Sequence, residues 1–195
     1  MRPGVEVQLP TATRLTAEGP LVRARAILSD PYLRELLENG FPARLHFRVE
    51  LWADARFFDE LQRTAEWDVI VRFRGVERTY EVLQVVGQRP LSLGAFTTLE
   101  DADAAVSRAV RVPIRAPAED RRFYYLAALR VEALSVSDLD EVNRWLRGDL
   151  QPAVRGDRNP GTALGRGLRA LATRLLGGER REYAEQSATF RPVQP

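Results

Sequence analysis

The chain has 195 residues, of which 45% are apolar, and its 29 basic residues, all arginine, leave a net charge of +2 against 27 acids. This size and apolar content suit one domain with a core and exclude a globally disordered chain. The absence of cysteine excludes disulfides, iron–sulfur clusters and thiolate metal sites. Because acids and arginines are interspersed, a nucleic-acid partner is disfavoured. No apolar run approaches the ~18 residues of a membrane-spanning helix, so the chain is expected to lie outside the bilayer.

Alternation of apolar and polar residues predicts most of the strands. In "RLHFRVELW", Leu45, Phe47, Val49 and Leu51 share one face, and polar residues occupy the other. In chain order the expected strands are 5–9, two short strands within 13–28 about a turn at 18–20, 43–52, 67–74, 78–87, 110–114 and 121–134. Between them, residues 53–66 lack clear periodicity, and we expect a loop with at most one helical turn.

Signals at helix ends predict the helices. Asp30 can cap a short helix that has Pro31 in its first position and Gly40 just past its end. Thr98 with Asp101 resembles a capping box at the start of another helix. The expected helices are 30–39, 98–108, 137–147 and 162–176.

The strand pattern predicts the fold class and its division. Polar faces on several strands favour antiparallel pairing, and many short strands are typical of a sandwich. We expect a mainly β protein, an antiparallel β-sandwich that is immunoglobulin-like in the broad sense, with three or four peripheral helices. The change of composition after residue 146 predicts a β-sandwich domain, 1–146, followed by 147–195. This second part comprises a Gly/Pro/Arg-rich connection, an amphipathic helix and a C-terminal tail.

The expected helix 162–176 has an apolar face and an arginine face. Leu164, Leu168, Leu171 and Leu175 recur at helical spacing, opposite the arginines. In one interpretation the leucines pack on the sandwich and the arginines are solvated. In the other, the arginines contact an anionic membrane surface or a larger partner. The candidate interaction residues are Arg155, Arg158, Arg166, Arg169, Arg174, Arg180 and Arg181.

His46 is the only histidine and the first candidate for catalysis or metal binding. One histidine without cysteine provides too few ligands for the usual zinc or iron site, and no nucleophile motif accompanies it. Its strand phase places it with Arg44 and Arg48 on the face away from the core, as a surface residue. The acidic clusters at 100–103 and 138–141 fall in first turns of expected helices, where the helix dipole accounts for them. We therefore expect no catalytic residue, metal site or cofactor.

Four motifs resemble, in order and spacing, a bacterial family described as a domain of unknown function (number 4390). They are "LVRARAILSD", "GFPARLHFRVELW", "TYEVLQVVG" and "RRFYYLAALRVEALSV", within residues 5–150. The run "SVSDLDEVNRWLRGDLQPAVRGDRNPGTALGRG" is similar to the version in Gemmatimonas-type bacteria. This resemblance implies a membrane-extrinsic subunit of the photosynthetic reaction centre–light-harvesting complex. Members begin with a signal peptide, which implies the periplasmic side; this chain shows none, so the cytoplasmic side stays open.

Three functions are compatible with these patterns. The expected one is a non-catalytic structural subunit that stabilises a larger membrane complex through its protein subunits, with anionic lipid headgroups as further partners. Such a subunit needs broad contact surfaces rather than one pocket. The alternative is a sandwich that binds a lipid or small molecule in an apolar cavity between its sheets. A hydrolase that uses His46 or a pair of carboxylates is the third.

Overall fold

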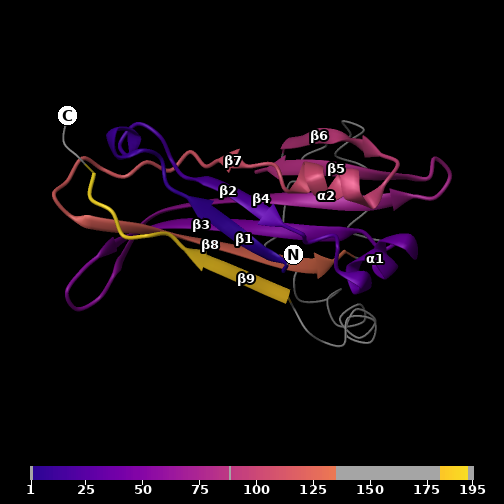
Figure 1. Cartoon of the computed structure of the whole chain (residues 1–195), viewed down its shortest axis with the longest axis horizontal. Coiled ribbons are helices and arrows are strands. Elements are labelled where there is room, and N and C mark those ends of the chain that lie inside the picture. The colour runs from indigo at the N-terminus through magenta and orange to yellow at the C-terminus, as the bar shows by residue number, and fades with distance from the viewer. Residues whose placement is uncertain (1, 88, 135–180, 193–195) are drawn as a thin grey trace, which may run out of the picture.

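The computed structural model describes residues 2–87, 89–134 and 181–192, which form a mainly β protein. A six-stranded antiparallel sheet has the order β6-β5-β4-β3-β8-β9, and a three-stranded antiparallel sheet has the order β1-β2-β7 (Figure 1). The strands are β1 (Gly4–Gln8), β2 (Leu21–Arg25), β3 (Ala43–Asp54), β4 (Glu60–Arg74), β5 (Thr79–Val86), β6 (Arg89–Phe96), β7 (Val110–Arg111), β8 (Arg122–Ala133) and β9 (Arg181–Gln186). The helices are α1 (Pro31–Glu38) and α2 (Leu99–Val106), with a 3₁₀ turn at Ala12–Arg14.

Strand β3 lies at the centre of the large sheet. It pairs with β4 on one side and with β8 on the other, so that Phe47 lies opposite both Trp67 and Leu129. The predicted alternation is confirmed, because Leu45, Phe47 and Val49 are each at most 2% exposed. Phe47 also stacks on Trp67 with ring centroids 4.8 Å apart. Paired on both sides and buried on one face, β3 fixes the register of its neighbours.

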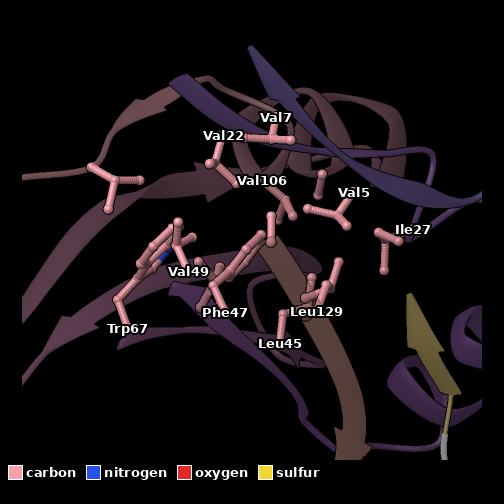
Figure 2. Close-up of a cluster of buried hydrophobic side chains, with 14 of the residues drawn as sticks. Val5, Val7, Val22, Ile27, Leu45, Phe47, Val49, Trp67, Val106 and Leu129 are labelled. Atoms are coloured by element: carbon pink, nitrogen blue, oxygen red, sulfur yellow. The ribbon is translucent and has the colours of Figure 1, made fainter. Parts of the chain in front are cut away.

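The two sheets share one hydrophobic core. Val5 and Val22 of the small sheet belong to the same buried cluster as Leu45, Phe47 and Leu129 of the large sheet (Figure 2). On strand β8 the predicted inward residues are buried as well. A smaller buried cluster comprises Ile70, Leu83 and Val85, whose strand phase places them on the opposite face of the large sheet. The large sheet is therefore apolar on both faces near β4 and β5.

Both helices begin as the capping signals predict. The Asp30 carboxylate accepts hydrogen bonds from the backbone N–H groups of Tyr32 and Leu33, and α1 is followed by Gly40 with φ +85°. The Thr98 hydroxyl accepts from the backbone N–H of Asp101 at 3.1 Å. The side chain of Asp103 on α2 accepts from the backbone N–H of Leu28 at 2.8 Å. This last bond ties α2 to the chain that follows β2.

Gly19 is required by a close approach of two segments. A Cβ atom at this position would lie 1.8 Å from the carbonyl oxygen of Val112. The backbone N–H of Val112 donates to the carbonyl of Pro20 at 2.9 Å, and Arg111 donates to the carbonyl of Gly19 at 3.0 Å. The predicted turn thus places β7 against the start of β2, and no larger residue fits there.

Three expected elements differ in the structure, one of them the strand expected at 110–114, of which only Val110–Arg111 forms a strand. Residues 53–66, predicted as a loop with at most one helical turn, instead complete β3 and form the first half of β4, with a turn only at 55–59. Because most side chains in the first half of β4 are polar, no apolar alternation indicates a strand there. Pairing with β3, rather than burial of its own side chains, holds this part of β4 in the sheet. Only one strand forms within 13–28, because residues 12–14 adopt a 3₁₀ turn.

Strands β6 and β9 were not predicted. Strand β9 lies in the segment expected to be a C-terminal tail, yet it pairs with β8 in the large sheet. Among the described residues there are two α-helices instead of three or four. The other expected helices, 137–147 and 162–176, lie outside the described residues, as does the boundary between 1–146 and 147–195.

Replacement of Phe47 with alanine should cost about 3–5 kcal/mol of unfolding free energy, because it removes a buried ring and leaves a cavity. Urea denaturation measures this loss. Phe58→Ala is the matched control, since the Phe58 side chain is 88% exposed and its removal should leave stability unchanged. Equal stability of the two variants would contradict the inward orientation of Phe47 on β3.

Asp103 provides a prediction about pH. Burial raises the pKa of its carboxyl above the ordinary 3.8, and the hydrogen bond from Leu28 opposes that rise. The folded protein therefore binds this proton more tightly than the unfolded chain, so the stabilisation is complete below pH 3.8 and is lost as pH rises through the folded pKa. Asp103→Asn, which keeps the acceptor oxygen without the charge, should melt above wild type at neutral pH.

The advantage of Asp103→Asn should shrink as the pH of the melting experiment falls toward 3.8. Asp103→Ala serves as the contrast, because it leaves the Leu28 N–H without its acceptor and should lower the melting temperature at neutral pH. An asparagine variant that melts below wild type at neutral pH would show that the ionised carboxylate stabilises the fold.

Candidate interaction surface

The hairpin between β3 and β4 carries two exposed phenylalanines. The strands end at Asp54 and begin again at Glu60, and the loop between them stands away from the remaining strands (Figure 1). The side chains of Phe57 and Phe58 are 84% and 88% exposed, and Leu61 beside them is 42% exposed. We call residues 55–61 the hairpin tip. Adjacent exposed aromatic side chains on a projecting loop are typical of a surface that another molecule covers.

Hydrogen bonds hold the base of the hairpin tip in place. The hydroxyl of Tyr124 on β8 donates to Asp59 at 2.8 Å, and the other oxygen of Asp59 accepts from the backbone N–H of Ala55 at 3.1 Å. Burial and this hydrogen bond to a carboxylate raise the pKa of Tyr124 to about 12. The hydroxyl therefore keeps its proton at neutral pH and stays a donor. The two phenylalanines are thus carried on a loop that is fixed to its neighbour strand.

Charges around the hairpin tip are balanced. Arg122 pairs with Asp54 at 2.8 Å, and Arg121 pairs with Glu60 at 3.1 Å. Exposed pairs of this kind stabilise little. With Arg56 and Asp59 of the loop included, residues 54–60 together with Arg121 and Arg122 carry three negative and three positive charges, so no positive excess surrounds the phenylalanines. Attraction to an anionic membrane depends on such an excess. The pattern of an apolar centre with charges of both signs around it is closer to a protein-binding surface.

His46 lies on the outer face of β3, as its strand phase predicts. Its Nδ1 atom is 2.8 Å from one oxygen of Asp68 on β4, and the other oxygen accepts from Arg44 at 2.7 Å. The side chain is 22% exposed, so it is less open to solvent than a freely hydrated surface residue. On the other side, Arg130 of β8 lies opposite His46 in the sheet and pairs with Glu182 of β9. These contacts are those of a hydrogen-bonded residue within a polar sheet face.

The buried carboxylate of Glu50 belongs to the same face. It is 8% exposed, accepts from Arg48 at 2.6 Å through one oxygen and from the indole N–H of Trp52 at 2.8 Å through the other. Both oxygens are therefore engaged by neighbours on the same strand. Within the described residues, no group of three or more histidines and acids is placed to hold a metal ion.

Of the seven predicted interaction arginines, the structure describes Arg181 alone. Its guanidinium pairs with Asp30, the capping residue of α1, and lies over the ring of Tyr32 with 5.9 Å to the centroid. These contacts tie the start of β9 to α1. An external role for Arg181 stays a prediction, and the other six arginines lie outside the described residues.

Sequence patterns do not single out the hairpin tip. Phe57 and Phe58 fall in a segment without clear periodicity, and neither a strand nor a helix pattern gives them a buried face. Two consecutive aromatic residues between charged neighbours are a weak signal of exposure, because both cannot point inward from a strand. Only the position of the loop relative to β8 makes them a surface feature.

Comparisons with known proteins do not assign the chain to a family: no family model, no curated protein and no solved structure matches it. The family resemblance drawn from the strand motifs stays a prediction. None of the helices among the described residues has the length and apolar character needed to cross a membrane.

His46→Ala should change the free energy of unfolding by about 1 kcal/mol or less, because it removes one partly exposed hydrogen bond and no core contact. Urea denaturation beside Phe47→Ala gives the comparison, since the two residues are neighbours on opposite faces of β3. A loss as large as that of the phenylalanine variant would mean that the pair with Asp68 holds β3 and β4 together.

Proposed function

We propose that the chain is a non-catalytic structural subunit, extrinsic to the membrane, which stabilises a larger membrane complex through contacts with its protein subunits. The observation that carries this proposal is the exposure of Phe57 and Phe58, at 84% and 88%, on a loop fixed by hydrogen bonds at its base. The structure supports docking through this loop. The membrane complex as the partner, and the reaction centre–light-harvesting complex in particular, rests on the family resemblance.

The hairpin tip has the properties of an anchor. Large aromatic side chains contribute most to binding when they enter a pocket of the partner and lose their water. A loop that is already held in its bound shape loses less conformational entropy on binding. The bonds that Asp59 accepts from the Tyr124 hydroxyl and from the backbone N–H of Ala55 provide that restraint. We therefore assign Phe57 and Phe58 the central contacts and the surrounding charges the rim.

The rest of the fold serves as a rigid support in this proposal. We interpret the two antiparallel sheets as an immunoglobulin-like β-sandwich, supported by the single core that joins them. A rigid body of this kind presents its loops in a fixed arrangement, as a clamp between subunits requires. The arginines of the segment 155–181 are proposed as a second contact region, on protein or on anionic headgroups.

The double variant Phe57→Ser/Phe58→Ser should lose the partner while its fold is kept. Both rings are exposed, so the melting temperature should hold, whereas loss of an aromatic anchor costs about 2 kcal/mol or more of binding free energy. Affinity purification from native membranes should recover membrane-complex subunits with wild type and at least about tenfold less with the variant.

Val76→Ser is the matched control for this experiment. Val76 is 95% exposed at the turn between β4 and β5, so the change removes an apolar surface residue away from the hairpin tip. It should retain the partner. If the double variant retains the partner as well, docking through the hairpin tip is wrong; if wild type recovers no membrane subunit, the partner class is wrong.

A further inference from the structure

A cavity of about 190 Å³ lies between the two sheets, beside α2. Val22 of β2 and Val106 of α2 form one side, and Phe47 of β3 and Trp67 of β4 form the other (Figure 2). All four side chains are buried, at 6% exposure or less. The cavity thus lies between the sheets at the edge of the main core, and Arg23 and Arg108 of its lining are exposed.

The size of this cavity sets it apart from ordinary packing. Protein interiors are packed as densely as organic crystals, and voids larger than a water molecule are few. An empty apolar void destabilises the fold in proportion to its volume. Engineered apolar cavities of about 150 Å³ stay dry and bind benzene. A cavity of about 190 Å³ therefore has room for one aromatic ring with a short chain, or for a short alkyl chain.

Two polar groups of the lining are available to a ligand. Gln84 of β5 lines the cavity and makes no hydrogen bond to another described residue. Arg108 is exposed and also lines the cavity. In the described part of the chain it forms no ion pair. By contrast, Arg23 in the same lining donates to Glu6 through two nitrogens, at 3.0 and 2.8 Å.

We propose that this cavity binds a small carboxylic acid whose apolar part is a single aromatic ring or a short alkyl chain. The apolar part occupies the space between Phe47, Trp67 and Val106, and the carboxylate meets Arg108 at the opening. An uncompensated guanidinium forms charge-assisted hydrogen bonds with a carboxylate, which fixes the orientation of the ligand. Gln84 donates a further hydrogen bond. This inference does not depend on docking through the hairpin tip.

The test uses 3-phenylpropionate as the probe and Trp67 as the reporter. The chain has three tryptophans, so replacement of Trp52 and Trp145 with phenylalanine leaves only the one in the cavity. Saturable quenching or shift of its fluorescence, with calorimetry on the unmodified chain, should give a dissociation constant between micromolar and millimolar. Acetate, which lacks the apolar part, should not bind. Absence of saturable binding by the probe would overturn the proposal.

Variants of the wall and of the opening test the assigned roles. Ala105→Leu, from α2, fills the cavity and should abolish binding while the melting temperature holds or rises, as expected when an empty space is filled. Ala24→Leu fills it from β2 and stands in if the first variant folds poorly. Binding that survives in a folded filled variant would place the probe elsewhere and overturn the proposal.

Arg108→Gln should weaken the binding of 3-phenylpropionate by roughly tenfold, which is the loss of affinity expected for one charge-assisted hydrogen bond. It should leave the neutral analogue 3-phenylpropanol unaffected. Arg115→Gln is the matched control, because Arg115 is an exposed arginine outside the cavity lining. Equal affinity of the acid for wild type and Arg108→Gln would remove the carboxylate from the proposed ligand class.

Discussion

The strict alternation of β3 is the constraint on which the rest of the structure depends. Because this strand is paired on both sides, a shift of one residue would carry its whole apolar set, Leu45, Phe47 and Val49 included, to the outer face. The register that keeps Phe47 inward also places His46 beside Asp68. The register of β3 and β4 shifts between Leu51 and Trp52, before the hairpin turns. Core and polar face are thus two results of one pairing.

The outer face of the large sheet shows how an arginine-rich chain keeps its charges satisfied. Asp68 accepts from two side chains of β3, Glu50 from two neighbours on its own strand, and Arg72 pairs with Glu81 on β5 at 2.5 Å. Cross-strand pairs of opposite charge stabilise a sheet modestly, and each has little effect alone. Taken together they match Arg44, Arg48 and Arg72 of this face with acids on the same or a neighbouring strand. The balance of acids and arginines therefore serves the pairing of charges within the sheet as well as the solubility of the chain.

Sequence patterns were reliable where one strand face is buried and weak elsewhere. The inward residues of β3, the second half of β4 and β8 were all predicted, because burial on one face imposes period two. Few side chains are buried in the first half of β4, from Glu60, and in the edge strands β6 and β9. These strands are therefore recognised only from their pairing with neighbouring strands. The phase of His46 was correctly derived, but its bond to Asp68 needed the register of two strands. Neither the exposed pair at Phe57 nor the cavity could be predicted, because each depends on how distant segments meet.

The place where β9 joins the sheet has a consequence for how the chain can vary. Strand β8 ends at Ala133 and β9 begins at Arg181, and Val131 lies opposite Arg181, so the chain leaves and re-enters the sheet at adjacent points. The entropy lost when a connection is closed grows only with the logarithm of its length. The sheet is therefore nearly indifferent to how many residues separate these two strands. Evolution, or an engineer, can therefore lengthen, shorten or exchange that connection without changing the pairing of β8 with β9.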